Sequence, residues 1–331
     1  MTYPAPVRYV EAGGARVSVI GLGTWQFGSR EWGYGDTYAR SEAVAITRRA
    51  LDLGVTLVDT AEIYGFGRSE KILAGPLTGR RDEAFLASKL FPVLPVPPVA
   101  RMRAAASIRR LGVEHLDLYQ LHAPNPAIPL ALSMRAMRQV RDRGLARHIG
   151  VSNCTLAQWQ RADRGLGAPV LSNQVRYSLA VRGPERDLLP WAQGNDRLLI
   201  AYSPLAQGLL SGAYDGSNTP KDVRRGNPLF QPESIVSARE LLDCLRQVAG
   251  ELGATPAQVS LAWLVRRPNV VAIPGARAVA QLEANVAAAE LVLTDEQDRA
   301  LTAASDTFRP PMGTAKVRRV PALRRRRVAR R

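Results

Sequence analysis

The sequence has few cysteines and no long apolar run, and both absences restrict the class of protein. Its 331 residues include only two cysteines, Cys154 and Cys244, far apart in the chain. We therefore expect no disulfide framework of the kind found in small secreted domains. No apolar run reaches the roughly 18 residues that a membrane-spanning helix needs. Residues 1–14 also lack the charged start and apolar stretch of a signal peptide. These absences predict a cytoplasmic protein without a membrane segment.

Three common site signatures are missing as well. The first predicted strand is not followed by G-x-G-x-x-G, the glycine pattern of a doubly wound dinucleotide-binding sheet. There is no G-x-S-x-G, the turn that presents a nucleophilic serine. The histidines His115, His122 and His148 are not spaced as metal-ligand pairs. We therefore predict no metal site and no serine nucleophile.

Acidic residues are absent from the end of the chain. Residues 309–331 contain nine Arg and one Lys, a charge of +10 out of the total of +16, so the other 308 residues carry only +6. Like charges repel one another, and this segment has little apolar surface to bury. We expect residues 309–331 to be a disordered basic tail. Such a tail contacts anionic surfaces non-specifically, and we predict no specific nucleic-acid partner.

What the sequence does contain is a repeated alternation of short apolar runs and longer helical periodicities. Eight such strand-like runs, nearly all followed by a helical stretch, predict a parallel sheet with right-handed crossovers. That number of units in residues 1–308 fits a single α/β domain, a closed (β/α)₈ TIM barrel. The predicted strands are residues 19–23, 56–60, 84–89, 116–122, 147–152, 170–174, 198–203 and 270–275.

Several segments fall outside this regular repeat. Two short alternating runs flank Ala12, Gly13 and Gly14, which predicts an N-terminal β-hairpin that plugs the bottom of the barrel. Residues 211–234, between strands seven and eight, are rich in Gly, Pro, Ser and Asn and predict a long loop. Extra helices are expected near 235–252 and 256–266. Residues 90–100 contain four prolines and predict an extended, stiff loop.

Polar residues stand where the predicted strands end, which is where chemistry is located in a barrel of this kind. Asp59 ends strand two, Lys89 ends strand three and His122 ends strand four, while Tyr64 follows strand two closely. Each residue alone has an ordinary interpretation: a strand-end Asp more often caps a helix, and a lone His is more often structural. Lys89, however, lies between apolar segments, where an unpaired charge is costly, so we expect it to pair with Asp59.

Together the four residues describe a proton-transfer site. A tyrosine has a pKa near about 10, which is high for proton donation and return at neutral pH. A neighbouring ammonium favours the tyrosinate, so we expect Lys89 to lower the pKa of Tyr64. Asp59 would keep Lys89 charged and oriented. His122 beside the phenol would hydrogen-bond a carbonyl oxygen and orient it.

The order of further motifs adds a resemblance to a known family. The segments are "VDTAEIYGFGRSE" (58–70), "ASKL" (87–90), "DLYQLHAP" (117–124), "GVSNC" (150–154), "SNQVRYSL" (172–179), "AYSPLAQGLLSG" (201–212) and "IPGARAVAQLEAN" (273–285). In this order and spacing they resemble the aldo-keto reductases, over residues from about 7 to about 305. The resemblance implies NADP(H)-dependent reduction of an aldehyde or ketone on a (β/α)₈ barrel, with a small-molecule carbonyl compound as substrate.

The resemblance also assigns roles to residues. Tyr64 is similar to the general acid, Lys89 to its partner, Asp59 to the carboxylate pairing that lysine, and His122 to the residue that positions the carbonyl. Trp25, Tyr64 and His122 are expected in the substrate pocket. The cofactor residues that it implies are Gly23, Thr24, Trp25, Asp59, Ser152, Asn153, Gln174, Tyr177, Ser203, Pro204, Leu205, Gln207, Gly208, Leu210, Gly275, Arg277, Gln281 and Asn285. Among these, Tyr177 is expected to stack on the nicotinamide ring.

Some alternatives remain open from the sequence. Tyr177 fits simple core packing as well as stacking, and Arg277 fits a solvated surface as well as a contact to the 2′-phosphate. The chain has Ala284 where many members have a Glu that contacts the adenine, and Ala276 where many have Ser or Thr, so NADH is possible beside NADPH. An NADP(H)-binding sensor subunit with little turnover is the alternative function. The sequence leaves the substrate and the oligomeric state, monomer or homo-oligomer, undetermined.

Overall fold

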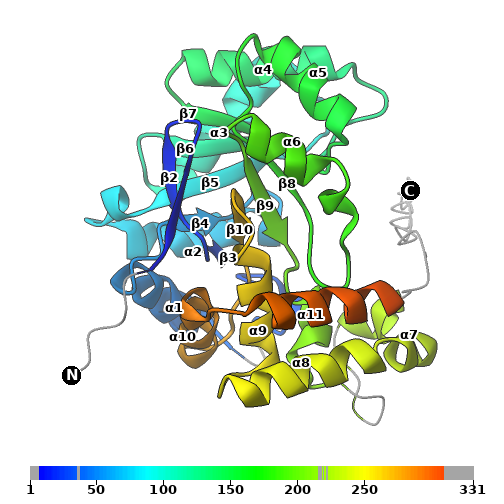
Figure 1. The fold of residues 1–331 in the computed structure, drawn as a ribbon. Coiled ribbons are helices and arrows are strands. Elements are labelled where there is room, and N and C mark those ends of the chain that lie inside the picture. Colours follow the sequence, from blue (N-terminus) through cyan, green and yellow to red (C-terminus); the bar gives the residue numbers. More distant parts are fainter. Residues whose placement is uncertain (1–6, 36–37, 215–217, 219, 221–222, 309–331) are drawn as a thin grey trace, which may run out of the picture.

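The protein folds as a barrel of parallel strands surrounded by helices (Figure 1). The computed structural model describes residues 7–35, 38–214, 218, 220 and 223–308. Eight strands pair in parallel in the order in which they occur along the chain. They are β3 (Leu22–Gly23), β4 (Leu57–Asp59), β5 (Phe85–Leu90), β6 (Leu116–Leu121), β7 (Ala146–Ser152), β8 (Ser172–Arg176), β9 (Leu198–Tyr202) and β10 (Val270–Ala272). Each predicted strand is present.

The first and last strands of the sheet meet, and this closes the barrel. Parallel bridges join Ile20 to Ala272 and Gly23 to Gly275. The backbone N–H of Gly23 also donates to the carbonyl of Pro274 at 3.0 Å. The predicted (β/α)₈ barrel is therefore confirmed. Residues 309–331 lie outside the described residues, so the basic tail and the domain boundary at 308 remain predictions.

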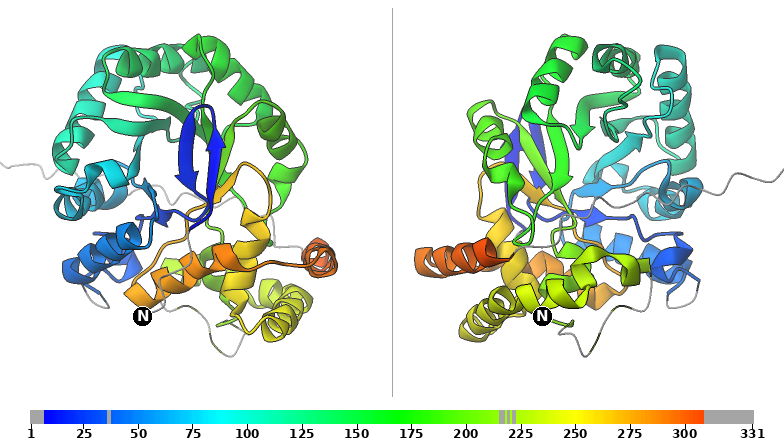
Figure 2. Two further views of the ribbon diagram at one scale, coloured as in Figure 1. Left: turned by 60° about the vertical axis from the view of Figure 1, so that its left-hand side comes forward. Right: turned by 90° about the vertical axis from the view of Figure 1, so that its right-hand side faces the viewer.

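An N-terminal hairpin covers one end of the barrel, as predicted. Strands β1 (Tyr9–Ala12) and β2 (Ala15–Ser18) pair antiparallel around a turn in which Gly13 and Gly14 have φ of 55° and 76°. Such left-handed angles favour glycine. The side chains of Ala12, Ala15 and Val17 pack with interior residues of the strands, among them Leu57 and Leu118. Figure 2 shows this hairpin lying across the barrel opening.

Helices pack on the outside of the barrel through their apolar faces. They are α1 (Arg40–Asp52), α2 (Arg68–Leu77), α3 (Pro97–Leu111), α4 (Leu130–Asp142), α5 (Leu156–Leu166), α6 (Leu188–Gly194), α7 (Pro232–Ser237), α8 (Arg239–Glu251), α9 (Pro256–Val265), α10 (Val279–Ala287) and α11 (Asp295–Thr307). Three of them, α1, α3 and α4, lie between predicted strands, where helical stretches are expected from the sequence. Gly54, Gly112 and Gly144 follow their last turns with positive φ, which is typical of a helix C-terminus.

Two loop predictions need refinement. The proline-rich loop predicted over 90–100 is shorter, because Leu90 still belongs to β5 and Pro97 already begins α3. A proline is tolerated in the first turn of a helix, where its missing N–H would have no partner. The predicted loop 211–234 is described only in part. It contains the 3₁₀ turns Val223–Gly226 and Pro228–Phe230, and α8 and α9 follow as the expected extra helices.

Among the described residues, every helix is too short or too polar to cross a bilayer. In the same part of the chain, no three His, Cys, Asp or Glu side chains are grouped closely enough to hold a metal ion.

Candidate functional site

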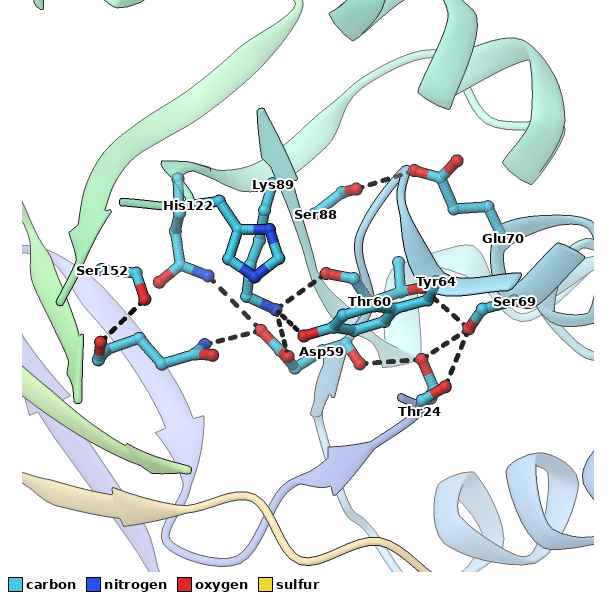
Figure 3. A network of polar contacts seen from close by, with 12 residues as sticks. Thr24, Asp59, Thr60, Tyr64, Ser69, Glu70, Ser88, Lys89, His122 and Ser152 are labelled. Carbon is cyan, nitrogen blue, oxygen red and sulfur yellow. Dashed lines mark hydrogen bonds and ion pairs between the residues drawn. The ribbon is translucent and has the colours of Figure 1, made fainter. Parts of the chain in front are cut away.

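Four polar side chains meet at the carboxyl ends of neighbouring strands. Asp59 is the last residue of β4, Lys89 the penultimate residue of β5, and His122 directly follows β6. Tyr64 begins a 3₁₀ turn (Tyr64–Gly67) in the loop after β4. Parallel strands end at the same edge of a sheet, and the register pairs Asp59 with Ala87, two residues before Lys89. The fold thus brings together the four residues that the sequence predicted (Figure 3).

Lys89 lies at the centre of this group and is fully buried. Its Nζ donates to Asp59 Oδ1 at 2.5 Å, to the carbonyl of Thr60 at 2.9 Å and to Tyr64 Oη at 3.2 Å. An ammonium group has three protons, and each has an acceptor here. A buried ammonium is tolerated only when it is paired and hydrogen-bonded in this way. The predicted pairing with Asp59 is therefore present in the structure.

The second oxygen of Asp59 is held by neutral amides. Its Oδ2 accepts from Gln174 Nε2 at 2.8 Å and from Gln120 Nε2 at 3.4 Å. These contacts fix the carboxylate without adding a second positive charge. Two strands, β6 and β8, therefore hold Asp59 in its orientation toward Lys89.

The pKa of Tyr64 does not move in the expected direction. Burial raises the pKa of the phenol above its ordinary value, and the opposing effect of Lys89 is smaller. Lys89 does lower the pKa of Tyr64 as predicted, but the desolvation of the tyrosinate, which the prediction did not include, outweighs it. For Lys89, burial lowers the pKa, but Asp59 and Tyr64 outweigh it, so the net pKa is raised. Around neutral pH the phenol keeps its proton and the lysine keeps its charge.

His122 lies next to the phenol and is uncharged. The rings of Tyr64 and His122 are 5.9 Å apart between centroids, edge to face. Burial and the positive charge of Lys89 lower the pKa of His122 to about 3. The Nδ1 atom of His122 is buried and has no hydrogen-bond partner among the described residues. With the ring proton on Nε2, the imidazole is a neutral donor.

Three hydroxyl groups brace the loop that carries Tyr64. Ser69 Oγ donates to the carbonyl of Thr24 at 3.0 Å, accepts from Thr60 Oγ1 at 3.0 Å, and lies 2.8 Å from Thr24 Oγ1. Thr24 Oγ1 also donates to the carbonyl of Asp59 at 2.9 Å. This buried network joins the ends of β3 and β4 to the start of α2 (Figure 3). The sequence analysis did not find Ser69; the only signal was a serine just after the glycine-rich turn.

A cavity of about 1130 Å³ opens beside these residues. Most of the predicted site residues line it: Gly23, Thr24, Trp25, Asp59, Tyr64, His122, Ser152, Asn153, Gln174, Ser203, Pro204, Leu205, Gln207, Gly208, Gly275, Arg277, Gln281 and Asn285. Lys89 lies behind Tyr64 and Asp59 and does not line the cavity. Leu210 is fully buried and also does not line it.

Tyr177 is not part of the cavity wall. It is fully buried, its ring lies 5.9 Å from that of Trp263, and its hydroxyl donates to Glu185 at 2.9 Å. The structure therefore contradicts the predicted stacking role of Tyr177 and supports its interpretation as core. Tyr202, at the end of β9, lines the cavity instead and donates to Asn153 Oδ1 at 3.0 Å. The sequence analysis missed it.

Unusual backbone geometry marks the segment after β9. Ser203, Ala206 and Gln207 have φ of 51°, 48° and 58°, and Gly208 has φ of 102°. Left-handed angles at non-glycine residues cost energy and are concentrated at functional sites. Successive N–H groups in such conformations also form concavities that bind anions.

The charge of the cavity wall is strongly positive. Five arginines line it, Arg30, Arg68, Arg176, Arg224 and Arg277, against two acidic residues, Glu31 and Asp59. Asp59 is already paired with Lys89. Arginine suits phosphate because its planar donors match phosphate oxygens. The cavity is therefore suited to a polyanionic ligand, and of these arginines the sequence had identified only Arg277.

Similarity to known proteins shows the family to which the chain belongs. A model of the aldo/keto reductase family matches residues 19–306. The chain belongs to the aldo/keto reductase family. An uncharacterised oxidoreductase of Mycobacterium tuberculosis is 53% identical over 305 residues, 92% of this chain and 94% of that protein. A methylglyoxal reductase of Escherichia coli is 34% identical over 287 residues, 86% of this chain and 90% of that protein.

A solved member of the family has the same fold. The structure of an aldo/keto reductase from Klebsiella pneumoniae in complex with NADP and acetate is 33% identical and has a TM-score of 0.72. The comparison covers 93% of this chain and 97% of that one. Together with the named relatives, it supports an oxidoreductase.

This aldo/keto reductase departs from the expected pattern at one end of the cavity. Gln281 Oε1 accepts from the backbone N–H of Arg277 at 2.9 Å, and Asn285 Nδ2 donates to the carbonyl of Gly275 at 3.4 Å. Glu283, the acid nearest to Ala284 in sequence, instead pairs with Arg49 at 2.7 Å. It does not line the cavity, so it does not take the place of the missing acid at position 284.

Proposed function

We propose that the protein catalyses the NADPH-dependent reduction of an aldehyde or ketone, or the reverse oxidation of an alcohol. The observation that carries this proposal is the buried contact series Asp59–Lys89–Tyr64, which ends beside His122 at the wall of a large cavity. A phenol that is hydrogen-bonded to a buried ammonium and faces a ligand cavity suits proton transfer to an oxygen atom.

The described residues fit the nicotinamide cofactor. The cavity is large and lined by five arginines, which suits the phosphates of a dinucleotide. Gly23 and Gly275 line the cavity, and a Cβ on either would come within 2.7 Å of Ile273 O or Gln26 Oε1, so a larger residue at either position would displace its neighbours. The NADP complex of the Klebsiella pneumoniae relative points to the same cofactor. When bound, NADPH supplies the hydride.

We infer specific tasks for residues around that cofactor. Arg277 would contact the 2′-phosphate, and the left-handed segment from Ser203 to Gly208 would hold the pyrophosphate. Ser152, Asn153 and Gln174 would hold the carboxamide. Gln174 already donates one amide N–H to Asp59, but its Oε1 remains available as an acceptor. Tyr202, rather than Tyr177, offers the aromatic surface in the cavity.

The proton then comes from Tyr64. Its raised pKa means that it is a neutral phenol at physiological pH, ready to donate to a carbonyl oxygen. Lys89 stabilises the tyrosinate that remains after donation, and Asp59 keeps Lys89 charged. Neutral His122 donates from Nε2 to the same carbonyl oxygen and orients it.

Replacing the phenol tests this assignment. Tyr64→Phe should lower kcat by about 10²–10⁴-fold, the usual contribution of a general acid, while the Kd for NADPH stays the same. Turnover is measured as NADPH oxidation with methylglyoxal and other aldehydes, and binding by quenching of protein fluorescence. Tyr119→Phe is the matched control: Tyr119 is also buried, lies on β6 and does not line the cavity, so its removal should leave kcat unchanged.

The same assay separates the proposed enzyme from a cofactor-binding sensor. Tight NADPH binding by the unaltered protein, without turnover of any aldehyde or ketone, would contradict the proposal. Normal turnover by Tyr64→Phe would contradict the role of Tyr64 alone.

A further inference from the structure

Phe66 is the most exposed large apolar side chain of the described residues, at 90% of its possible surface. It follows the proposed proton donor by two positions, in the turn "YGFG". Its φ of 55° and ψ of 50° place it in the left-handed region. That conformation is an outlier for a bulky side chain, and glycine or asparagine adopts it at lower cost. The chain thus carries two unfavourable features at one residue, backbone strain and an exposed aromatic ring.

The needs of the turn do not explain a phenylalanine here. Gly65 and Gly67 on either side also have positive φ, and each has a close neighbour that a side chain would have to displace. A Cβ on Gly65 would lie 2.8 Å from the carbonyl oxygen of Gly28, and one on Gly67 would lie 2.8 Å from Arg110 Cδ. The side chain at position 66 is exposed, and asparagine would satisfy the backbone there better. Strain of this kind is maintained at functional sites.

The position of Phe66 places it at the wall of the ligand cavity. Phe66 lines the same cavity as Tyr64 and His122. Its turn packs on the segment from Trp25 to Trp32, since Gly65 abuts Gly28 and Arg68 Nη1 donates to the carbonyl of Gly28 at 3.3 Å. A molecule that reaches the rim from Tyr64 therefore passes over aromatic surface.

Two tryptophan rings adjoin the reaction site on the same cavity wall. The rings of Trp25 and Trp32 are 4.9 Å apart, and Trp25 lies 6.4 Å from Tyr64. Trp25 is itself 44% exposed. Exposed aromatic surface at the edge of a cavity gains free energy when an apolar ligand covers it.

We propose, on the basis of the carbonyl reduction proposed above, that Phe66 is a specificity-determining residue that contacts the apolar body of the substrate. The substrate class is then aldehydes or ketones with an extended apolar chain, with the carbonyl group at Tyr64 and His122 and the chain running over Trp25 to Phe66. A short aldehyde occupies only the inner part of this path and does not reach Phe66.

A homologous series of straight-chain aldehydes, from propanal to decanal, tests this inference with NADPH as reductant. For the unaltered protein, kcat/KM should rise with chain length. Phe66→Asn should lower kcat/KM for decanal by about tenfold, a loss of about 1.4 kcal/mol, and leave that for propanal unchanged. Its Tm should stay the same or rise, because asparagine accepts the left-handed backbone. A rise in Tm together with a loss of selectivity excludes general damage to the fold.

Leu94 provides a matched control. It too is an exposed apolar residue in the left-handed region, with φ of 51° and 54% exposure, but it does not line the cavity. Leu94→Asn should leave kcat/KM unchanged at both ends of the series. Turnover without any preference for longer chains, or an equal effect of Leu94→Asn, would overturn this inference and leave carbonyl reduction standing. No turnover of any aldehyde or ketone by the unaltered protein would overturn both.

Discussion

Replacing Lys89 by methionine should damage stability and catalysis together, and a second substitution should separate the two effects. Lys89 is fully buried and its three protons are bound by Asp59, Thr60 and Tyr64. Methionine fills a similar volume without the charge. The carboxylate of Asp59, only 1% exposed, then keeps no partner except the amides of Gln174 and Gln120.

The size of the loss follows from that unpaired carboxylate. Removing one partner of a buried ion pair costs about 3–5 kcal/mol, because the other charge stays desolvated. We therefore expect the free energy of unfolding of Lys89→Met to fall by about that amount, measured by urea denaturation at neutral pH without cofactor. Adding Asp59→Asn to Lys89→Met removes the unpaired carboxylate. It should restore most of the lost free energy of unfolding, since a neutral pair in place of a buried ion pair is often tolerated.

We expect the double variant to regain its free energy of unfolding but not its kcat. In the double variant the phenol has no ammonium beside it, so proton donation from Tyr64 leaves an unstabilised tyrosinate and kcat stays low. Recovery of kcat together with the free energy of unfolding would refute the idea that Lys89 acts on Tyr64. A loss of stability below about 1 kcal/mol in Lys89→Met, the range of exposed ion pairs, would refute the desolvated pair itself.

Two further predictions concern His122 and Arg277. Because burial and Lys89 lower the pKa of His122 to about 3, kcat/KM should show no step near the ordinary histidine pKa of about 6.5; an NMR titration of the imidazole that finds a midpoint there would contradict this. The unfolded chain binds a proton that folded His122 does not, so its contribution to stability is full above about pH 6.5 and is lost as the pH falls toward 3. Arg277→Ala should raise the KM for NADPH by about tenfold or more, since a hydrogen bond to a charged group contributes about 1.5–3 kcal/mol, and leave the KM for NADH unchanged. Equal effects on both cofactors would exclude a 2′-phosphate contact.

The barrel and its four central residues are predictable because they depend on simple periodicities. Apolar runs alternate with amphipathic stretches, and parallel strands end on one side, so polar residues at strand ends must gather there. Asp59, Lys89 and His122 are all found by this rule. Applied to strand β9, the same rule would also have found Tyr202, which stands at its end.

Tyr177 shows where sequence reasoning fails. Successive residues of a strand point to opposite sides, and in β8 Gln174 and Arg176 line the cavity while Val175 does not. Tyr177, just beyond the strand, continues on the outer side and packs on Trp263. Its motif was identified correctly, but the direction of its side chain depends on the alternation and not on the motif. The left-handed backbone of Phe66 was equally unpredictable from the sequence. Such angles are expected at glycine or asparagine, and a phenylalanine gives no signal for them.

The opposing influences on Tyr64 bear on the direction of the reaction. Burial favours the neutral phenol and Lys89 favours the tyrosinate, and the balance leaves the pKa above its ordinary value. Reduction needs the phenol as donor, whereas alcohol oxidation needs the tyrosinate as base. Lys89 keeps its proton into the alkaline range, since its own pKa is raised. Its ammonium group therefore still stabilises the tyrosinate as the pH increases. If Tyr64 is the proton donor as proposed, the raised pKa favours reduction at neutral pH, and oxidation should gain relative to reduction as the pH rises.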